Sequence, residues 1–222
     1  MNRRKFAVSL LALLILALFG LGIWSYQQSV KKAQTQAAEQ QADRLVRPHA
    51  PAFGPASAPV TIVEFFDPAC ETCRAFYPIV KDILRQYPQE VRLVIRYAPF
   101  HAGSDQVIQM LETARLQDKY QPVLEALLAS QPQWADHGQP RIDLAEQQAQ
   151  RAGLNIEKAK LDAQRADVQA VLKLDVEDLV ALQITKTPSF FVNGRALPSF
   201  GEAQLRDLVA DAVAQARAMP GK

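Results

Sequence analysis

Two short runs of apolar residues stand out in the middle of the chain. Residues 60–66 (VTIVEFF) and 91–97 (VRLVIRY) are nearly continuous in apolar side chains, which is typical of buried central strands. Between them, residues 71–87 repeat apolar side chains at helical spacing and stop before Pro88, with Pro78 inside the helix, where a kink is expected. Strand, helix and strand at this spacing predict a βαβ unit with parallel strands.

The pattern then becomes helical from residue 104 to residue 184. Asp143, Asn155 and Asp167 are expected to cap three of these helices. The last helix is expected to bury one face, formed by Val168, Val171, Leu172, Val176, Leu179 and Val180. A stretch of this length without a convincing strand predicts a helical subdomain rather than a loop.

Sheet signals return near the C-terminus. Residues 187–197 are rich in strand-forming residues around Asn193-Gly194, a strong signal for a hairpin turn. A final amphipathic helix is expected over residues 202–216. The order of elements is therefore βαβ, helical insert, ββα, which predicts an α/β fold.

The first 58 residues differ from the rest. After Arg3-Arg4-Lys5, an uncharged apolar run reaches Tyr26, enough at about 1.5 Å per residue to cross a bilayer core of roughly 30 Å. Residues 1–26 are expected to be an uncleaved signal anchor, a transmembrane helix, with a cleaved signal peptide as the alternative. Residues 27–58 are expected to be a solvated tether, rather than an oligomerising helix, and an extended segment leading to a domain at 59–218.

Composition narrows the chemistry. The chain has 222 residues, a net charge of +2 and scattered basic residues, which gives no argument for nucleic acid. Its only two cysteines are Cys70 and Cys73, so it has no framework of structural disulfides. A single CxxC pair in a chain of this kind indicates redox chemistry, with a zinc half-site and an inert pair as alternatives.

The motif Cys70-Glu71-Thr72-Cys73 lies where the first predicted strand gives way to its helix. The first turn of a helix has unpaired N–H groups and the positive end of the helix dipole, which favour an anion. A cysteine placed there ionises more easily, and its thiolate is the reactive form. A second thiol can then attack a mixed disulfide and close a ring within the motif.

Three stretches together resemble one known family: residues 63–73 (VEFFDPACETC), the helical insert, and residues 187–194 (TPSFFVNG). Over about residues 45–218 the chain resembles the DsbA-like group of thioredoxin-fold thiol–disulfide oxidoreductases. The resemblance implies a thioredoxin fold with a helical insertion, and no cofactor beyond the Cys70–Cys73 disulfide. It implies that Cys70 is the exposed nucleophile and Cys73 the more buried resolving thiol. Pro188 would be a cis-proline facing the motif, with the Thr187 backbone binding extended substrate.

The resemblance also gives Glu64 a role, as a buried acid that moves protons to or from Cys73. We expect Arg96, on the neighbouring strand, to be its counter-ion; the alternative is that Glu64 points outward. Many family members have Pro with His or Tyr between the cysteines, where this chain has Glu71 and Thr72. The negative charge of Glu71 is expected to raise the pKa of Cys70 and to make a weaker oxidant than the strongest DsbA-like proteins. His101 follows the second strand and is expected in a solvated loop, with a place near the motif as the alternative.

The expected function is dithiol–disulfide exchange with exported cysteine-containing proteins, on the periplasmic side of a bacterial cytoplasmic membrane. A quinone-linked oxidase or a membrane electron donor would be the redox partner, and an oxidase or general oxidoreductase is favoured over an isomerase. The alternative is a periplasmic copper-handling or holdase protein that uses the two cysteines as soft ligands. No separate metal site is expected.

Overall fold

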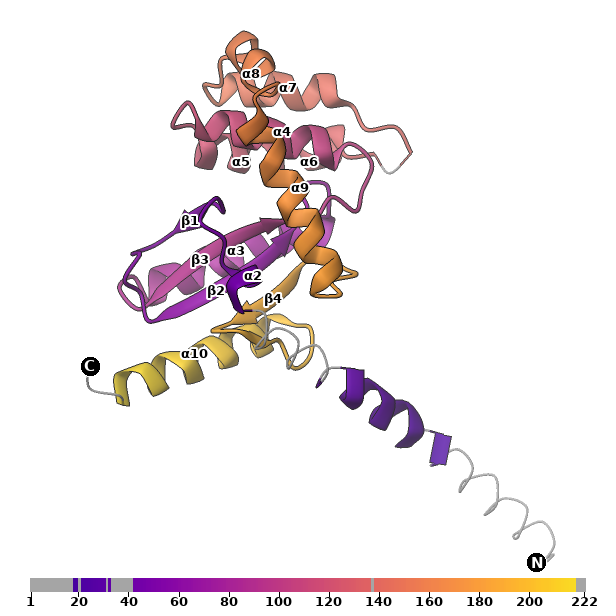
Figure 1. The fold of residues 1–222 in the computed structure, drawn as a ribbon, viewed down its shortest axis with the longest axis vertical. Coiled ribbons are helices and arrows are strands. Elements are labelled where there is room, and N and C mark those ends of the chain that lie inside the picture. The colour runs from indigo at the N-terminus through magenta and orange to yellow at the C-terminus, as the bar shows by residue number, and fades with distance from the viewer. Residues whose placement is uncertain (1–17, 20, 31, 33–41, 137, 219–222) are drawn as a thin grey trace, which may run out of the picture.

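The computed structural model describes residues 18–19, 21–30, 32, 42–136 and 138–218 (Figure 1). The anchor expected over residues 1–26 therefore lies mostly outside the described residues, as does most of the tether before residue 42. Within the described ranges, no helix has the length and apolar character needed to cross a membrane.

A five-stranded sheet forms the centre of the domain, in the order β1-β3-β2-β4-β5. Strands β2 (Val60–Phe66) and β3 (Val91–Tyr97) are parallel and pair over their full length, so the predicted βαβ unit is confirmed. Strand β4 (Ser189–Val192) pairs antiparallel with β2 and turns through Asn193 and Gly194, both at positive φ, into β5 (Arg195–Ala196). The predicted hairpin is thus confirmed as well.

Residues 42–58 are expected to be the end of the tether and an extended segment leading into the domain, and the structure shows two short elements there. They contain the short helix α2 (Ala42–Leu45) and strand β1 (Ala52–Phe53), which pairs antiparallel with the edge of β3. Leu45 is buried in a core cluster with strand residues. A two-residue strand among prolines leaves no periodic pattern in the sequence, so only the fold reveals it.

Helix α3 (Glu71–Gln86) follows β2 and contains Pro78, and helix α10 (Glu202–Ala218) closes the chain. The insert between β3 and β4 is helical throughout the described residues, as predicted. Its helices are α4 (Ser104–Arg115), α5 (Tyr120–Ala129), α6 (Gln131–Trp134), α7 (Ile142–Arg151), α8 (Ile156–Asp162) and α9 (Ala166–Ala181).

One of the three predicted helix caps is confirmed, and the other two are wrong. The Asn155 side chain accepts from the N–H of Lys158 and caps α8. Asp143 and Asp167 do not cap, because α7 and α9 begin one residue before each of them. Each of these aspartates instead pairs with an arginine two residues earlier, at 2.8 and 2.7 Å.

Helices cover both faces of the sheet. Figure 1 shows α4–α8 gathered at one end of the sheet, α9 running from that group across one face, and α10 on the far side. Because side chains alternate along a strand, Ile62 and Phe66 pack in the cluster that includes α3 and α10, whereas Val63 and Phe65 pack in the cluster that includes α9. The carboxyl ends of β2 and β3 meet where α3 and α4 begin.

The predicted face of α9 is confirmed in part. Val168, Val171 and Leu179 are buried as expected, whereas Val176 and Val180 are 39% and 76% exposed. Asp175 and Asp178 are fully buried on this helix, where they bond to a buried arginine, Arg96, at 2.7 and 2.8 Å. A buried charge persists only when it is paired, so the part of α9 that meets Arg96 buries aspartates rather than these two valines.

Candidate active site

The two cysteines lie at the beginning of α3, as predicted. Cys70 is the N-cap residue, with extended backbone (φ −76°, ψ 120°), and its sulfur accepts from the N–H of Cys73 at 3.5 Å. Both cysteines are free thiols in this structure. Cys70 is 5% exposed and Cys73 0%, so the order of burial is as expected, although Cys70 is less exposed than an open surface nucleophile.

The surroundings of Cys70 favour its thiolate. Its pKa is lowered to about 5, first through a hydrogen bond with the Cys73 side chain, and further through the Thr187 side chain and the N–H groups of Cys73 and Thr72, against burial, which raises it. The direction is opposite to the one expected from Glu71. The hydrogen bonds made by the Cys70 sulfur account for this direction, because they favour the charged form. The value lies between the values of about 7 and about 3.5 found in thioredoxin and in the strongest DsbA-type oxidants.

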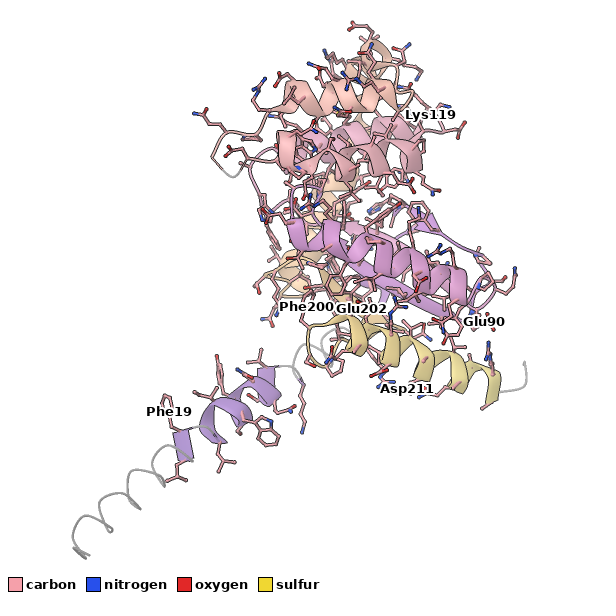
Figure 2. The ribbon with its side chains drawn as sticks, turned by 180° about the vertical axis from the view of Figure 1, so that it is seen from behind. Phe19, Glu90, Lys119, Phe200, Glu202 and Asp211 are labelled. Carbon is pink, nitrogen blue, oxygen red and sulfur yellow. The ribbon has the colours of Figure 1, made fainter. Side chains whose placement is uncertain are left out.

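The cis-proline loop faces the motif. The peptide bond between Thr187 and Pro188 is cis, as the resemblance implied, and Cys70 Sγ lies 3.5 Å from the Thr187 carbonyl oxygen. A groove of about 450 Å³ runs beside this loop, with Pro188, Phe190 and Phe200 among its lining residues. Figure 2 shows Phe200 just before α10, and its ring lies 4.8 Å from that of Phe76 in α3.

Glu64 lies in the core, not on the surface. It is 2% exposed, and its Oε1 atom is buried without a hydrogen-bond partner among the residues that the structure describes. Burial, and then the negative charge of Cys70, raise its pKa to about 8. The pKa of Cys73 is raised above its usual range by burial, by its hydrogen bond with Cys70 and by the charge of Glu64. An acid that can hold a proton at neutral pH thus lies close to the buried thiol.

The expected pairing of Glu64 with Arg96 is wrong. In the register of the sheet, Glu64 lies opposite Ile95, and Arg96 lies opposite Phe65, so the two charged side chains project from opposite faces. The Arg96 guanidinium bonds to Asp175 and Asp178 at 2.7 and 2.8 Å. Arg96 therefore belongs to the ion cluster under α9.

Two further residues, Gln131 and Asp67, contact the motif and were not predicted from the sequence as site residues. Gln131, buried at the beginning of α6, donates from Nε2 to the carbonyls of Pro68 and Cys70 at 2.8 and 3.0 Å. Asp67, fully buried, accepts the N–H of Ala69 at 2.9 Å and the ring nitrogen of His101 at 2.7 Å. Asp67 directly follows a buried strand and precedes the cysteines by three residues, and that position was the available signal.

A βαβ…ββα sheet with a CxxC pair at the first turn of a helix, opposite a cis-proline, defines a thiol–disulfide oxidoreductase of the thioredoxin fold. A family model described as Thioredoxin matches residues 47–211. The chain belongs to this family, and Cys70 and Cys73 form its CxxC pair.

Solved structures with this fold include proteins of the same class. A thioredoxin-like oxidoreductase from Silicibacter pomeroyi is 31% identical, with a TM-score of 0.67 over 80% of this chain and 98% of that chain. The thiol-disulfide exchange protein alpha-DsbA2 from Wolbachia pipientis, 16% identical, has a TM-score of 0.69 over 82% of this chain and 97% of that chain, and it shares the fold.

The chain is also similar to one part of a longer protein. The Na(+)/H(+) antiporter NhaA 3 of Salinispora tropica is 33% identical over 147 residues, which is 64% of this chain. The chain spans 21% of the length of that relative.

Proposed function

We propose that this oxidoreductase exchanges disulfides with exported, cysteine-containing proteins while anchored to the outer side of a bacterial cytoplasmic membrane, with Cys70 as nucleophile and Cys73 as resolving thiol. The observation that carries the assignment of roles is the contrast between the two sulfurs. Cys70 caps a helix, receives hydrogen bonds and lies 3.5 Å from the carbonyl oxygen of Thr187, the residue before Pro188, whereas Cys73 is fully buried near Glu64.

Exchange proceeds in two steps. The Cys70 thiolate attacks a substrate disulfide, forms a mixed disulfide and expels one substrate thiolate. Cys73 then loses its proton and attacks Cys70 Sγ, which forms the Cys70–Cys73 disulfide and releases the second substrate thiolate. The dithiol loses two electrons and the substrate gains them; the same steps in reverse oxidise a substrate.

Glu64 is the proton acceptor for Cys73 in the resolving step. Its pKa of about 8 lets it exchange a proton near neutral pH, and an unpartnered Oε1 atom is available to take one. Thr187 and the cis peptide before Pro188 hold extended substrate beside Cys70 through backbone pairing.

Turnover assays with variants test this assignment. Insulin reduction and oxidative refolding of a reduced substrate are both expected to be lost in Cys70→Ser. With Cys73→Ser, a mixed disulfide on Cys70 is expected to accumulate. Tight copper(I) binding with neither activity would instead favour the metal-handling alternative.

The direction of exchange follows from the redox potential. A Cys70 pKa of about 5, above the value of about 3.5 for the strongest oxidant of the class, supports a weaker oxidant, working as an oxidase or general oxidoreductase. A glutathione titration that gives a potential near about −120 mV would refute this. Alkylation trapping in cells would find the pair mostly oxidised for an oxidase and mostly reduced for a reductase.

The anchor rests on the sequence of residues 1–26: basic residues followed by an uncharged apolar run. After carbonate washing of membranes, the full chain is expected to stay in the membrane fraction. A chain that lacks residues 1–26 is expected to be released into the wash. A mature protein that begins after Tyr26 would show a cleaved signal peptide instead.

A further inference from the structure

The carboxylate of Asp67 holds together three segments around the motif. It accepts the N–H of Ala69 at 2.9 Å, within the CxxC loop. It accepts the N–H groups of Phe100 and His101 at 2.8 and 3.0 Å, in the loop after β3. It also accepts the hydroxyl of Ser104, the first residue of α4. No atom of Asp67 is exposed to solvent.

His101 completes this set. Its Nδ1 lies 2.7 Å from Asp67 Oδ2, and the tautomer with the hydrogen on Nδ1 donates to this oxygen. The imidazole side chain is 28% exposed, so it lies between the buried carboxylate and solvent.

The backbone of Asp67 makes hydrogen bonds to both Cys70 and Cys73. Its N–H donates to Cys73 Sγ at 3.5 Å, and its carbonyl accepts the N–H of Cys70 at 3.1 Å. Burial, the bond with Cys70 and the charge of Glu64 all oppose ionisation of Cys73, whereas the bond from Asp67 favours it. This peptide N–H is therefore a donor directed at the sulfur that must become an anion.

We propose that Asp67 is a positioning residue for the resolving step: its carboxylate, held by His101, Ser104 and the loop after β3, fixes the peptide N–H that stabilises negative charge on Cys73 Sγ. This inference rests on the proposed roles of Cys70 and Cys73. The same donor stabilises the Cys73 thiolate when it attacks the mixed disulfide and when it leaves during substrate oxidation. It acts as an oxyanion-hole donor does, by being in place before charge develops.

Asp67→Asn tests the proposal because it keeps the shape of the side chain. Either orientation of the amide places its NH2 group against backbone N–H donors that meet a carboxylate oxygen in the wild type, so those hydrogen bonds are lost and the clamp loosens. Reduced protein is mixed with glutathione disulfide and quenched with acid at successive times. Mass spectrometry then gives the rate of glutathionylation at Cys70 and the rate at which Cys73 releases glutathione.

We expect Asp67→Asn to slow release about tenfold, which corresponds to about 1.4 kcal/mol, while glutathionylation stays within about twofold. Asp175→Asn is a matched control. Asp175 is also fully buried, accepts the Tyr97 N–H at 2.7 Å and contacts a histidine, His49, at 2.7 Å, but it lies under α9 on the other face of the sheet. It is expected to lower stability without changing the ratio of the two rates.

A second pair of variants keeps the test independent of whether Asp67→Asn folds. His101→Ala is expected to slow release in the same way, and His101→Asn, whose amide can replace the Nδ1 hydrogen, to restore most of it. The proposal is overturned if Asp67→Asn or His101→Ala releases glutathione at the wild-type rate. It is also overturned if Asp67→Asn and Asp175→Asn slow glutathionylation and glutathione release to the same extent. Cys73→Ala tests the underlying roles of the two cysteines separately from the role of Asp67. If no mixed disulfide forms on Cys70 in that variant, the assignment of Cys70 as nucleophile is refuted.

Discussion

Replacing Glu64 by glutamine should change how the stability of the reduced domain depends on pH. The side chain is buried, and its pKa is raised from 4.5, the value of an exposed glutamate, to about 8. Below pH 4.5 the acid is protonated in the folded and the unfolded chain, and its contribution to stability is fully present. Between pH 4.5 and 8 the unfolded chain gives up a proton that the folded chain keeps, so stability falls as pH rises.

The size of this effect follows from the pKa. At about 1.36 kcal/mol per pH unit, the raised pKa corresponds to a loss of about 5 kcal/mol between pH 4.5 and pH 8. Glu64→Gln keeps the shape and removes the ionisation. The free energy of unfolding of the variant, minus that of the wild type, is therefore expected to rise with pH over this window. Subtraction cancels most of the opposite contribution of Cys70, whose lowered pKa adds stability as pH rises.

Urea denaturation under a phosphine reductant, at several pH values from 5 to 8, measures the difference. Glu71→Gln, which removes an exposed carboxylate from the same motif, controls for the loss of one negative charge. In the oxidised protein Cys70 carries no charge, so the slope should be smaller there. A difference between variant and wild type that stays flat within about 1 kcal/mol across the range would refute the argument that Glu64 is a buried acid with a raised pKa.

Three further outcomes are expected. The Cys70 thiolate, followed by absorbance at 240 nm or by alkylation rate, should titrate near pH 5, and Thr187→Val should move the midpoint upward by removing a hydrogen bond. Gln131→Leu should lower the free energy of unfolding by about 1–3 kcal/mol in urea titrations, because two buried carbonyls lose their donor. Arg96→Met should cost about 3–5 kcal/mol in the same assay, because the carboxylates of Asp175 and Asp178 lose their one fully buried cation, while the titration of Cys70 stays unchanged.

The central part of the fold could be predicted because buried strands and helix faces require apolar residues at regular positions in the sequence. Strands β2 and β3 were predicted residue for residue, since a strand buried on both faces is apolar along its whole length. The turn at Asn193-Gly194 and the helix that begins at Glu71 have equally local signals. The redox pair followed from its place between these two elements.

Features set by long-range charge could not be predicted in the same way. The burial of Asp175 and Asp178 in α9 depends on their meeting Arg96, about eighty positions earlier, and a hydrophobicity pattern counts both aspartates as surface residues. The face on which Arg96 projects depends on the register between β2 and β3. Asp67 acts through donors from the loop after β3, which the sequence alone does not bring to it.

The ion cluster under α9 has a consequence for how this domain can be cut out of the chain. Arg44 and Arg47 bond to Asp178 at 3.0 and 2.7 Å, and both precede the first long strand. A recombinant fragment trimmed to residue 59 would discard two of the three guanidinium groups around that carboxylate, together with the edge strand β1. Fragments intended for crystallisation or NMR should therefore start at residue 42 or earlier.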